Sequence, residues 1–281
     1  MKKQALLAIA GAVTVLLLFW FGRTTETKKA VQLPITSGPK EFDVQQFINS
    51  TKLKLSPEQE VFITKLENGI SRGNVPAQQV QAYNSLANFW KDSLQLLEPY
   101  LFYLGKAAKL DNSEKSLTFA GQIFLEALRG EQDESKLSWE TREAIELFEN
   151  AIRLNPANDD LRIGLGSAYV YGKGRGGNPE ETMKGIQELL AVARKDSNNM
   201  KAQMVLGVGG LVSGQFDKAL ERFQRVVNKE PENLEAIAYL ADAYAAKGNK
   251  EEAIKWYTIS KRVANNPRYA EEVDKRIKSL Q

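Results

Sequence analysis

Pairs of neighbouring carboxylates are the residues of this sequence that come nearest to a catalytic arrangement, because one carboxyl group can act as an acid and the other as a base. Such pairs occur at Asp159-Asp160, Glu180-Glu181 and Glu251-Glu252. We expect each pair in the first turn of a helix, where negative charge stabilises the helix dipole by about 0.3–1 kcal/mol. This structural role accounts for the pairs, so we do not assign them to catalysis.

A glycine-rich stretch at 172–179, Gly-Lys-Gly-Arg-Gly-Gly-Asn-Pro, invites comparison with loops that bind phosphate through backbone N–H groups ahead of a helix. It lacks the Gly-x-x-x-x-Gly-Lys-Ser/Thr order, and no strand is predicted before it. The alternative is an inserted turn in which Asn178 and Pro179 start the next helix. We favour the inserted turn.

The composition excludes several kinds of chemistry. The 281 residues include no cysteine and no histidine, which removes thiolate nucleophiles, imidazole acid–base catalysis and metal sites built from these side chains. A formal net charge of +3, from 38 basic and 35 acidic residues that interleave, does not favour nucleic-acid binding. We expect no enzymatic activity, no cofactor, no metal site and no nucleic-acid partner.

The elements that position these residues follow a 34-residue period. Leu206, Gly207 and Gly210 lie in one predicted helix, and Ala219, Phe223 and Val226 lie in the next, before Pro231. The pattern recurs later at Leu240, Ala241, Tyr244, Ala253, Tyr257 and Ser260, and earlier at Leu165, Gly166, Tyr169, Gly185, Leu189 and Val192. One helical pair cannot bury its own apolar face, so a fixed period predicts stacked pairs in a solenoid.

The motif Leu-Gly-x-x-Tyr, then Ala-x-x-x-Phe and Pro, resembles that of the tetratricopeptide repeat (TPR) family. It appears three times in register over 159–265, although Arg162, Gln203 and Ile237 stand where the family usually has an aromatic residue. The resemblance implies an all-α, right-handed solenoid of helical hairpins. It also implies a concave surface, lined by the first helices, that receives a peptide or a partner helix.

An apolar run without charged residues, 4–22, ends in Phe19, Trp20 and Phe21. It would span roughly 28 Å as a helix, close to the hydrocarbon thickness of a bilayer. A cleaved signal peptide is the alternative, but small residues suited to cleavage do not follow the run. We predict a transmembrane signal anchor, with the repeats on the periplasmic side of an inner membrane. Cytoplasmic repeats are the alternative, because basic residues flank both ends of the run.

The predicted organisation divides the chain into seven parts. These are a basic tail (1–3), the transmembrane anchor (4–22), a flexible tether (23–41), N-terminal capping helices (42–76), two degenerate repeat units (77–156), three clearer units (157–266) and a C-terminal capping helix (267–281). In the capping region, Ser56 and Gln59 form a capping-box pattern around Pro57, and the helix that they start should end at Gly73.

Positions that the resemblance places on the concave surface are candidate partner-binding residues. They are Asn84, Asn88, Lys91, Thr118, Gln122, Ile163, Ser167, Val170, Met204, Val208, Leu211, Ala238 and Asp242. Among them, Met204, Val208 and Leu211 form an apolar stripe at helical spacing, on a helix that is apolar on both sides. Either this stripe contacts a partner, or tight superhelical curvature or the chain's own terminal helix buries it.

The interpretation is a membrane-anchored adaptor that binds a partner protein or peptide, similar to bacterial membrane-anchored TPR proteins that assist assembly or secretion of envelope proteins. The alternative is a structural scaffold that associates with further copies of itself and has no peptide groove. The sequence does not choose among the possible partners, because a fold does not define the molecule that it binds.

Overall fold

The computed structural model describes residues 41–72 and 75–281, and in these ranges it contains helices joined by turns and no strand. The all-α expectation is therefore confirmed for this part of the chain. The predicted tail (1–3), membrane anchor (4–22) and all but the last residue of the tether (23–41) lie outside the described residues. The helices are α2 (Val44–Lys52), α3 (Pro57–Arg72), α4 (Pro76–Asn88), α5 (Leu97–Asp111), α6 (Glu114–Gly130), α7 (Glu134–Leu154), α8 (Asp159–Ala168), α9 (Pro179–Lys195), α10 (Met200–Val212), α11 (Phe216–Lys229), α12 (Leu234–Ala246), α13 (Lys250–Ala264) and α14 (Pro267–Leu280).

Capping side chains define where many of these helices begin. At α3, the Gln59 backbone N–H donates to Ser56 Oγ over 3.3 Å, and the Ser56 backbone N–H donates to Gln59 Oε1 over 3.0 Å. These two bonds form the predicted capping box and satisfy backbone donors that the helix leaves free. Asparagine takes the N-cap position of α8 to α10 and of α12 to α14, each time accepting a backbone N–H bond.

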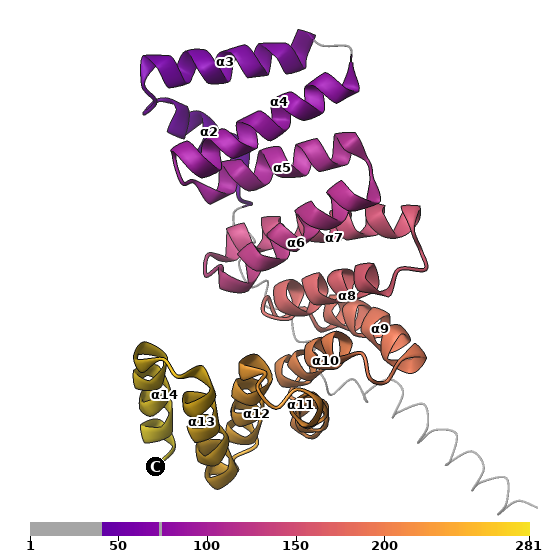
Figure 1. Cartoon of the computed structure of the whole chain (residues 1–281), viewed down its shortest axis with the longest axis vertical. Coiled ribbons are helices and arrows are strands. Elements are labelled where there is room, and N and C mark those ends of the chain that lie inside the picture. Colours follow the sequence, from indigo (N-terminus) through magenta and orange to yellow (C-terminus); the bar gives the residue numbers. More distant parts are fainter. Residues whose placement is uncertain (1–40, 73–74) are drawn as a thin grey trace, which may run out of the picture. The chain divides into compact units, whose positions relative to one another are not determined.

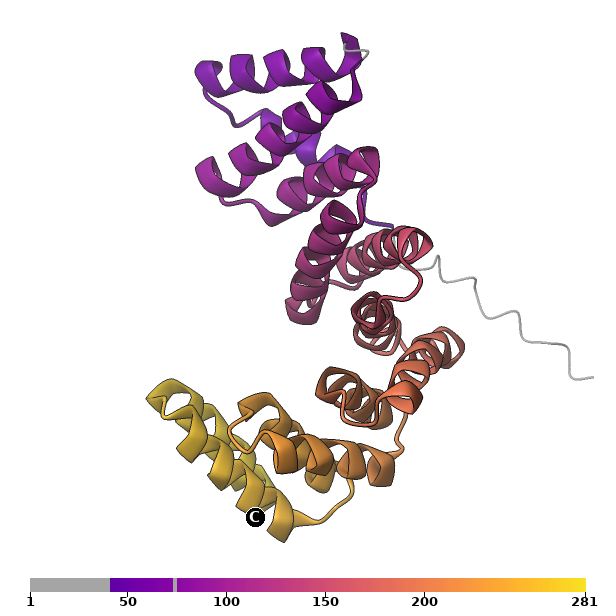
Figure 2. The same cartoon turned by 45° about the vertical axis from the view of Figure 1, so that its right-hand side comes forward.

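Successive helices pack against each other in chain order, which is the arrangement that a repeated helical pair predicts (Figure 1). The pairs are α4–α5, α6–α7, α8–α9, α10–α11 and α12–α13, and α14 packs on α13. The view turned by 45° shows the same succession of helices (Figure 2). Each pair thus contributes to a core that runs along the stack rather than to a single centre.

Close approach of helices depends on glycine at a few positions. A Cβ atom on Gly207 of α10 would lie 2.5 Å from the ring of Phe223 on α11. The ring of Phe148 on α7 similarly lies against two glycines, Gly121 of α6 and Gly164 of α8, at 3.0 and 2.3 Å from their ideal Cβ positions. Both rings are buried, so the small residues create the space that the aromatic side chains fill.

Two π-helical segments, η1 (Phe89–Ser93) and η2 (Tyr169–Lys173), extend the first helices of two pairs. After η2 comes the predicted inserted turn, and α9 begins at Pro179 with Asn178 as its N-cap. Arg175 of the turn donates to the backbone carbonyls of Leu128 over 2.9 Å and Glu131 over 2.6 Å. The insertion therefore closes the carboxyl end of α6, where the helix leaves carbonyl groups without partners.

Apolar side chains of α14 cover the end of the stack. Val273 is 2% exposed and packs in a small cluster with Ala241, Ala253 and Tyr257. The rest of α14 is largely polar, as expected of a terminal helix that faces solvent on its other side. Within residues 41–72 and 75–281, no helix combines the length and apolar composition needed to cross a bilayer.

Candidate functional site

A pocket of about 230 Å³ lies between α12, α13 and α14, the three helices that lie side by side at the carboxyl end of the chain (Figure 1). Its lining residues are Glu235, Ala238, Tyr239, Asp242, Tyr257, Tyr269, Glu272, Val273 and Arg276. Two of them, Ala238 and Asp242, are predicted partner-binding residues. Sites that enclose a drug-sized ligand measure about 300–1,000 Å³, so this smaller pocket fits a single side chain better than a cofactor.

Asp242 is the centre of the hydrogen-bond network in this pocket. Its Oδ1 atom accepts from the Tyr257 hydroxyl and, over 3.2 Å, from Arg276 Nη1. The other end of the same guanidinium donates to Glu272 Oε1 over 3.1 Å. Arg276 therefore holds two carboxylates in place, and α14 is attached through it to α12.

Each acidic side chain in the pocket uses only one oxygen in these bonds. Asp242 accepts at Oδ1, Glu272 at Oε1, and Glu235 at Oε1, the last from Arg129 of α6. Within residues 41–72 and 75–281, no donor contacts the second oxygen of any of the three carboxylates. Ionised carboxylates can accept several hydrogen bonds each, so the pocket retains acceptor capacity for a positively charged donor.

Aromatic rings form much of the remaining wall. Tyr239 stacks on Phe223 with ring centroids 5.4 Å apart, which fixes its orientation. Tyr257 is 5% exposed, and burial, together with the bond to Asp242, raises the pKa of its hydroxyl to about 12. Tyr269, from α14, is half-buried and also lines the pocket. Tyrosine rings beside carboxylates suit a cation, which is attracted both by ring faces and by negative charge.

The other eleven predicted partner-binding residues differ in how exposed their side chains are. Asn84, Asn88, Lys91 and Gln122 are exposed, Thr118 and Leu211 are half-buried, and Ile163, Ser167, Val170, Met204 and Val208 are buried. Of the predicted set, the pocket therefore brings together Ala238 and Asp242 and none of the other eleven.

The apolar stripe on α10 was expected either to contact a partner or to be buried within the chain. Its first two residues are buried. Met204 is 7% and Val208 is 6% exposed, so both lie in the core that runs along the stack. α10 packs against α8, η2 and α12 as well as α9 and α11, so the neighbouring first helices cover it on both sides. A partner can reach little of this stripe apart from Leu211.

The pocket contains residues that the sequence interpretation did not assign to binding, chiefly Tyr239, Tyr269, Glu272 and Arg276. The sequence contains one indication that Arg276 belongs to the site: it follows Asp242 by 34 residues, which is the repeat period. α14 thus occupies the register of a sixth first helix, and its Arg276 corresponds to Asp242. Treating α14 only as a polar cap concealed this equivalence.

The other chemically suggestive residues have structural roles, and several of them form ion pairs within the chain. The three carboxylate pairs lie in the first turns of α8, α9 and α13. Ion pairs join Asp159 to Lys195 at 2.6 Å and Asp160 to Lys201 at 3.0 Å. In the glycine-rich turn, Lys173 pairs with Glu181 at 3.0 Å. The positive charge of this lysine is thus already paired within the chain.

Residues 211–271, which contain α11 to α13 and most of the pocket, match the family model described as tetratricopeptide repeat. The resemblance to this family is therefore confirmed over these residues, which carry tetratricopeptide repeat sequence. It has no match among curated protein sequences.

Several solved structures are similar to this chain. YrrB, described as a TPR protein with an unusual peptide-binding site, is 23% identical, with a TM-score of 0.44 over 69% of this chain and 91% of its own. MamA from Desulfovibrio magneticus RS-1 is 16% identical, with a TM-score of 0.47 over 66% and 95%. PilW, described as a widely conserved type IV pilus biogenesis factor, is 18% identical, with a TM-score of 0.46 over 72% and 93%.

Proposed function

We propose that this protein is a non-enzymatic adaptor that binds a segment of a partner protein in the pocket between α12 and α14. The observation that carries the proposal is the pocket itself, in which three carboxylates with unused acceptor oxygens lie among tyrosine rings. Most of its lining lies within the tetratricopeptide match, which supports a role in protein recognition. Its volume, about 230 Å³, favours one anchoring side chain over a small-molecule ligand.

The chemistry of the lining favours arginine as the anchoring side chain. A planar guanidinium carries five donors and stacks on aromatic rings, whereas a lysine ammonium does neither as well. The chain already presents guanidinium groups to these carboxylates, because Arg276 bonds Asp242 and Glu272 while Arg129 bonds Glu235. A partner arginine would use the remaining oxygens.

Selection from a random dodecapeptide library displayed on phage tests this proposal without a known partner. The bait is the full-length chain in mild detergent, and we expect arginine to be enriched in the selected peptides. The Asp242→Asn/Glu272→Gln double variant should lose this enrichment, because both changes remove charge at nearly constant volume. Glu251→Gln, an exposed acidic residue of α13 outside the pocket, is the matched control.

The outcomes separate the two levels of the proposal. In one outcome, the parent chain and the control select peptides that the double variant does not select, but these peptides show no preference for arginine. This outcome would support the pocket as a binding site and reject arginine as the anchoring side chain. Equal selection by the parent chain and the double variant, or no selected peptides at all, would reject the pocket as the binding site.

We also propose that the apolar segment 4–22 anchors the protein in an inner membrane and places the repeats in the periplasm, where the adaptor would assist assembly or secretion of envelope proteins. Deletion of residues 1–22 should release the protein from sedimented membranes, whereas the full chain should resist alkaline carbonate extraction. Protease digestion of the repeats in spheroplasts tests the periplasmic side, and digestion only after lysis would favour the cytoplasmic alternative.

Self-association is a second candidate, favoured by exposed apolar residues near α3. Leu53 is 88%, Val61 is 69% and Val75 is 48% exposed, on the end of the stack opposite to α14. Large apolar side chains left exposed near one helix favour an interaction site there. Sedimentation velocity of the detergent-solubilised chain should show an oligomer that Leu53→Asp/Val61→Asp dissociates; a monomer at all concentrations would reject this candidate.

A further inference from the structure

A buried glutamate without a hydrogen-bond partner lies where the first described helix joins the repeats. Glu140 of α7 is 0% exposed, and neither Oε1 nor Oε2 has a donor within residues 41–72 and 75–281. An ionised carboxylate in such a place loses its hydration and gains nothing in return. The neutral, protonated form is therefore the one that this packing accommodates.

The charged groups that face Glu140 strengthen the preference for the neutral form. They are Glu98 at the start of α5, Glu131 in the turn before α7, and Lys136 one helical turn earlier on α7. Burial first, and then the negative charges of Glu131 and Glu98, raise the pKa of Glu140 to about 8, although Lys136 acts in the opposite direction. Glu140 thus changes charge near neutral to mildly basic pH.

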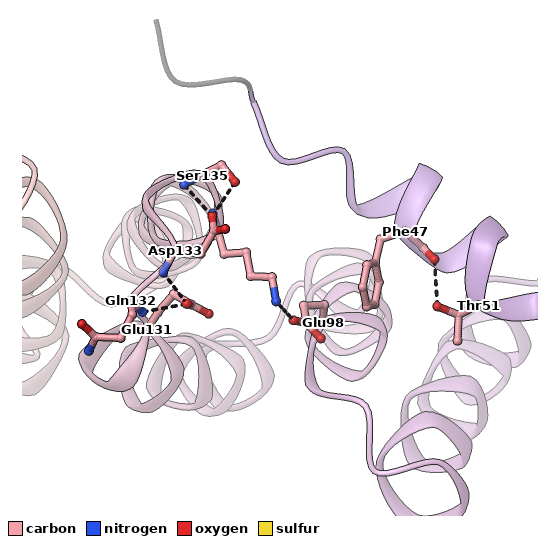
Figure 3. Close-up of polar contacts among 8 residues, drawn as sticks. Phe47, Thr51, Glu98, Glu131, Gln132, Asp133 and Ser135 are labelled. Carbon is pink, nitrogen blue, oxygen red and sulfur yellow. Dashed lines mark hydrogen bonds and ion pairs between the residues drawn. The ribbon is translucent and has the colours of Figure 1, made fainter.

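Lys136 is the cation that a charged Glu140 would attract, but it is engaged elsewhere. It forms an ion pair with Glu98, which Figure 3 shows beside Phe47 of α2. Its ammonium group also lies 5.8 Å from the ring centroids of both Phe42 and Phe47. Lys136 therefore connects α7 to α5 and to residues of the 41–52 segment, which contains α2.

The 41–52 segment has other contacts as well, among them the ion pair of Lys52 with Glu67 of α3 at 2.6 Å. The ring of Phe42 packs on Trp139 of α7 with centroids 5.4 Å apart, and Ile48 is fully buried. Glu41 pairs with Arg142 at the surface, where such a pair contributes little. Glu131 accepts the backbone N–H groups of Gln132 and Asp133 at Oε1, each at 2.7 Å, which fixes this carboxylate in the turn before α7 (Figure 3).

We propose that the 41–52 segment is docked on α5 and α7 while Glu140 holds its proton, and that loss of this proton draws Lys136 toward Glu140 and loosens the segment. Residues four apart on a helix face the same side, so Lys136 can exchange Glu98 for Glu140 without unwinding α7. The exchange also removes the ammonium from the rings of Phe42 and Phe47. Because this segment follows the predicted tether, the switch would control how firmly the repeats are joined to the membrane-proximal part of the chain.

Hydrogen–deuterium exchange of the full-length chain in mild detergent tests the proposal. After correction for intrinsic exchange, peptides covering 44–52 should lose protection about tenfold between pH 6 and pH 7 and level off above pH 8. The docked state keeps the Glu140 proton up to a pKa of about 8, whereas an unburied glutamate loses it near 4.5, and a proton-linked equilibrium shifts by about that factor per pH unit between the two values. Glu140→Gln cannot ionise and should keep the segment equally protected at both pH values. Glu149→Gln, an exposed glutamate of the same helix, should behave as the parent chain.

Two further measurements keep the test independent of how well Glu140→Gln folds. In the parent chain, the carbon-13 resonance of the Glu140 carboxyl group should titrate well above the usual range of glutamate; titration near pH 4.5 would reject the proposal. Lys136→Met retains the apolar stem without the ammonium and should weaken protection of 44–52 at both pH values. The proposal would also be rejected if protection of residues 44–52 did not depend on pH in the parent chain. It would be rejected as well if Glu140→Gln showed the same pH-dependent loss of protection.

Discussion

The hydroxyl of Tyr257 on α13 donates a hydrogen bond to Oδ1 of Asp242 on α12, the same oxygen that Arg276 of α14 contacts at 3.2 Å. Three helices therefore meet at one carboxylate oxygen, and neither of these donors bonds the second oxygen. The bond fixes the orientation of Asp242 in the pocket. It also links the ionisation of a buried tyrosine to the proposed binding site.

This link predicts a shift in the titration of Tyr257. Burial is the larger cause that raises its pKa to about 12, and the bond to Asp242 is the second. Asp242→Asn should lower the pKa of Tyr257 but leave it above the usual value of about 10. NMR of tyrosine labelled with carbon-13 at Cζ, assigned with Tyr257→Phe, measures the shift, and an unchanged pKa would contradict the role of Asp242.

The same shift defines a range in which stability depends on pH. Because the pKa of Tyr257 is higher in the folded than in the unfolded chain, its contribution to stability is complete below about pH 10. The contribution is then lost as the pH rises through 12. Asp242→Asn should therefore reduce the difference in unfolding free energy between pH 10 and pH 12, whereas Glu251→Gln should not.

Gly207 provides a test of helix packing. Gly207→Ala would place Cβ 2.5 Å from the ring of Phe223, and overpacking of this kind costs about 1–3 kcal/mol. Better helix propensity returns about 1 kcal/mol at most, so we expect a net loss in the free energy of unfolding. Gly69→Ala in α3 is the matched control, because no atom lies within 4 Å of its ideal Cβ position.

The control should move in the opposite direction, with a gain of about 0.5–1 kcal/mol from helix propensity alone. Urea denaturation followed by circular dichroism measures both variants. Equal effects of the two substitutions would show that Phe223 can move away from Gly207 without cost.

Arg175 gives the inserted turn a structural role that a substitution can measure. Its guanidinium contacts the carbonyls of Leu128 and Glu131 at once, whereas a lysine ammonium lacks the planar fork. Arg175→Lys should destabilise the repeats by about 1–2 kcal/mol through lost hydrogen bonds. Arg225→Lys on α11 is the control, because its ion pair with Glu221 joins residues of one helix. Thermal unfolding that does not distinguish the two variants would reject this role.

The ion pair between Arg129 and Glu235 joins residues 106 positions apart, but both side chains are partly exposed, at 42% and 45%. Solvent screens such a pair, so a double-mutant cycle with Arg129→Ala and Glu235→Ala should give a coupling energy below about 1 kcal/mol. Arg129 also lies over the ring of Tyr171, with 4.7 Å to its centroid. A coupling of several kcal/mol would show that the pair is more constrained than its exposure indicates.

Much of the helical architecture follows from the sequence because the same local sequence features recur in successive repeats. Gly207 predicted close packing and Phe223 fills the space, while Ser56 and Asn178 predicted helix starts that the structure contains. These features depend on residues near one another in the chain. The 34-residue period and the helix-capping residues are therefore sufficient to predict these features.

The site was harder to predict because it depends on how neighbouring helices cover each other. Met204 has the spacing of a groove residue, yet adjacent first helices bury it. The burial of Glu140 is similarly set by packing around α7 rather than by its neighbours in sequence. Two π-helical segments add turns of helix that hydrophobic periodicity does not report.

The order of helix contacts along the stack also determines how the molecule can unfold. Because most contacts join helices that are one or two places apart in the chain, the stack resembles a one-dimensional array in which folding starts at many points and spreads. Local contacts of this kind are associated with rapid folding. Helices at either end can fray while the interior stays intact, and α2, α3 and α14, each with a single buried residue, are the ones whose loss exposes the least core.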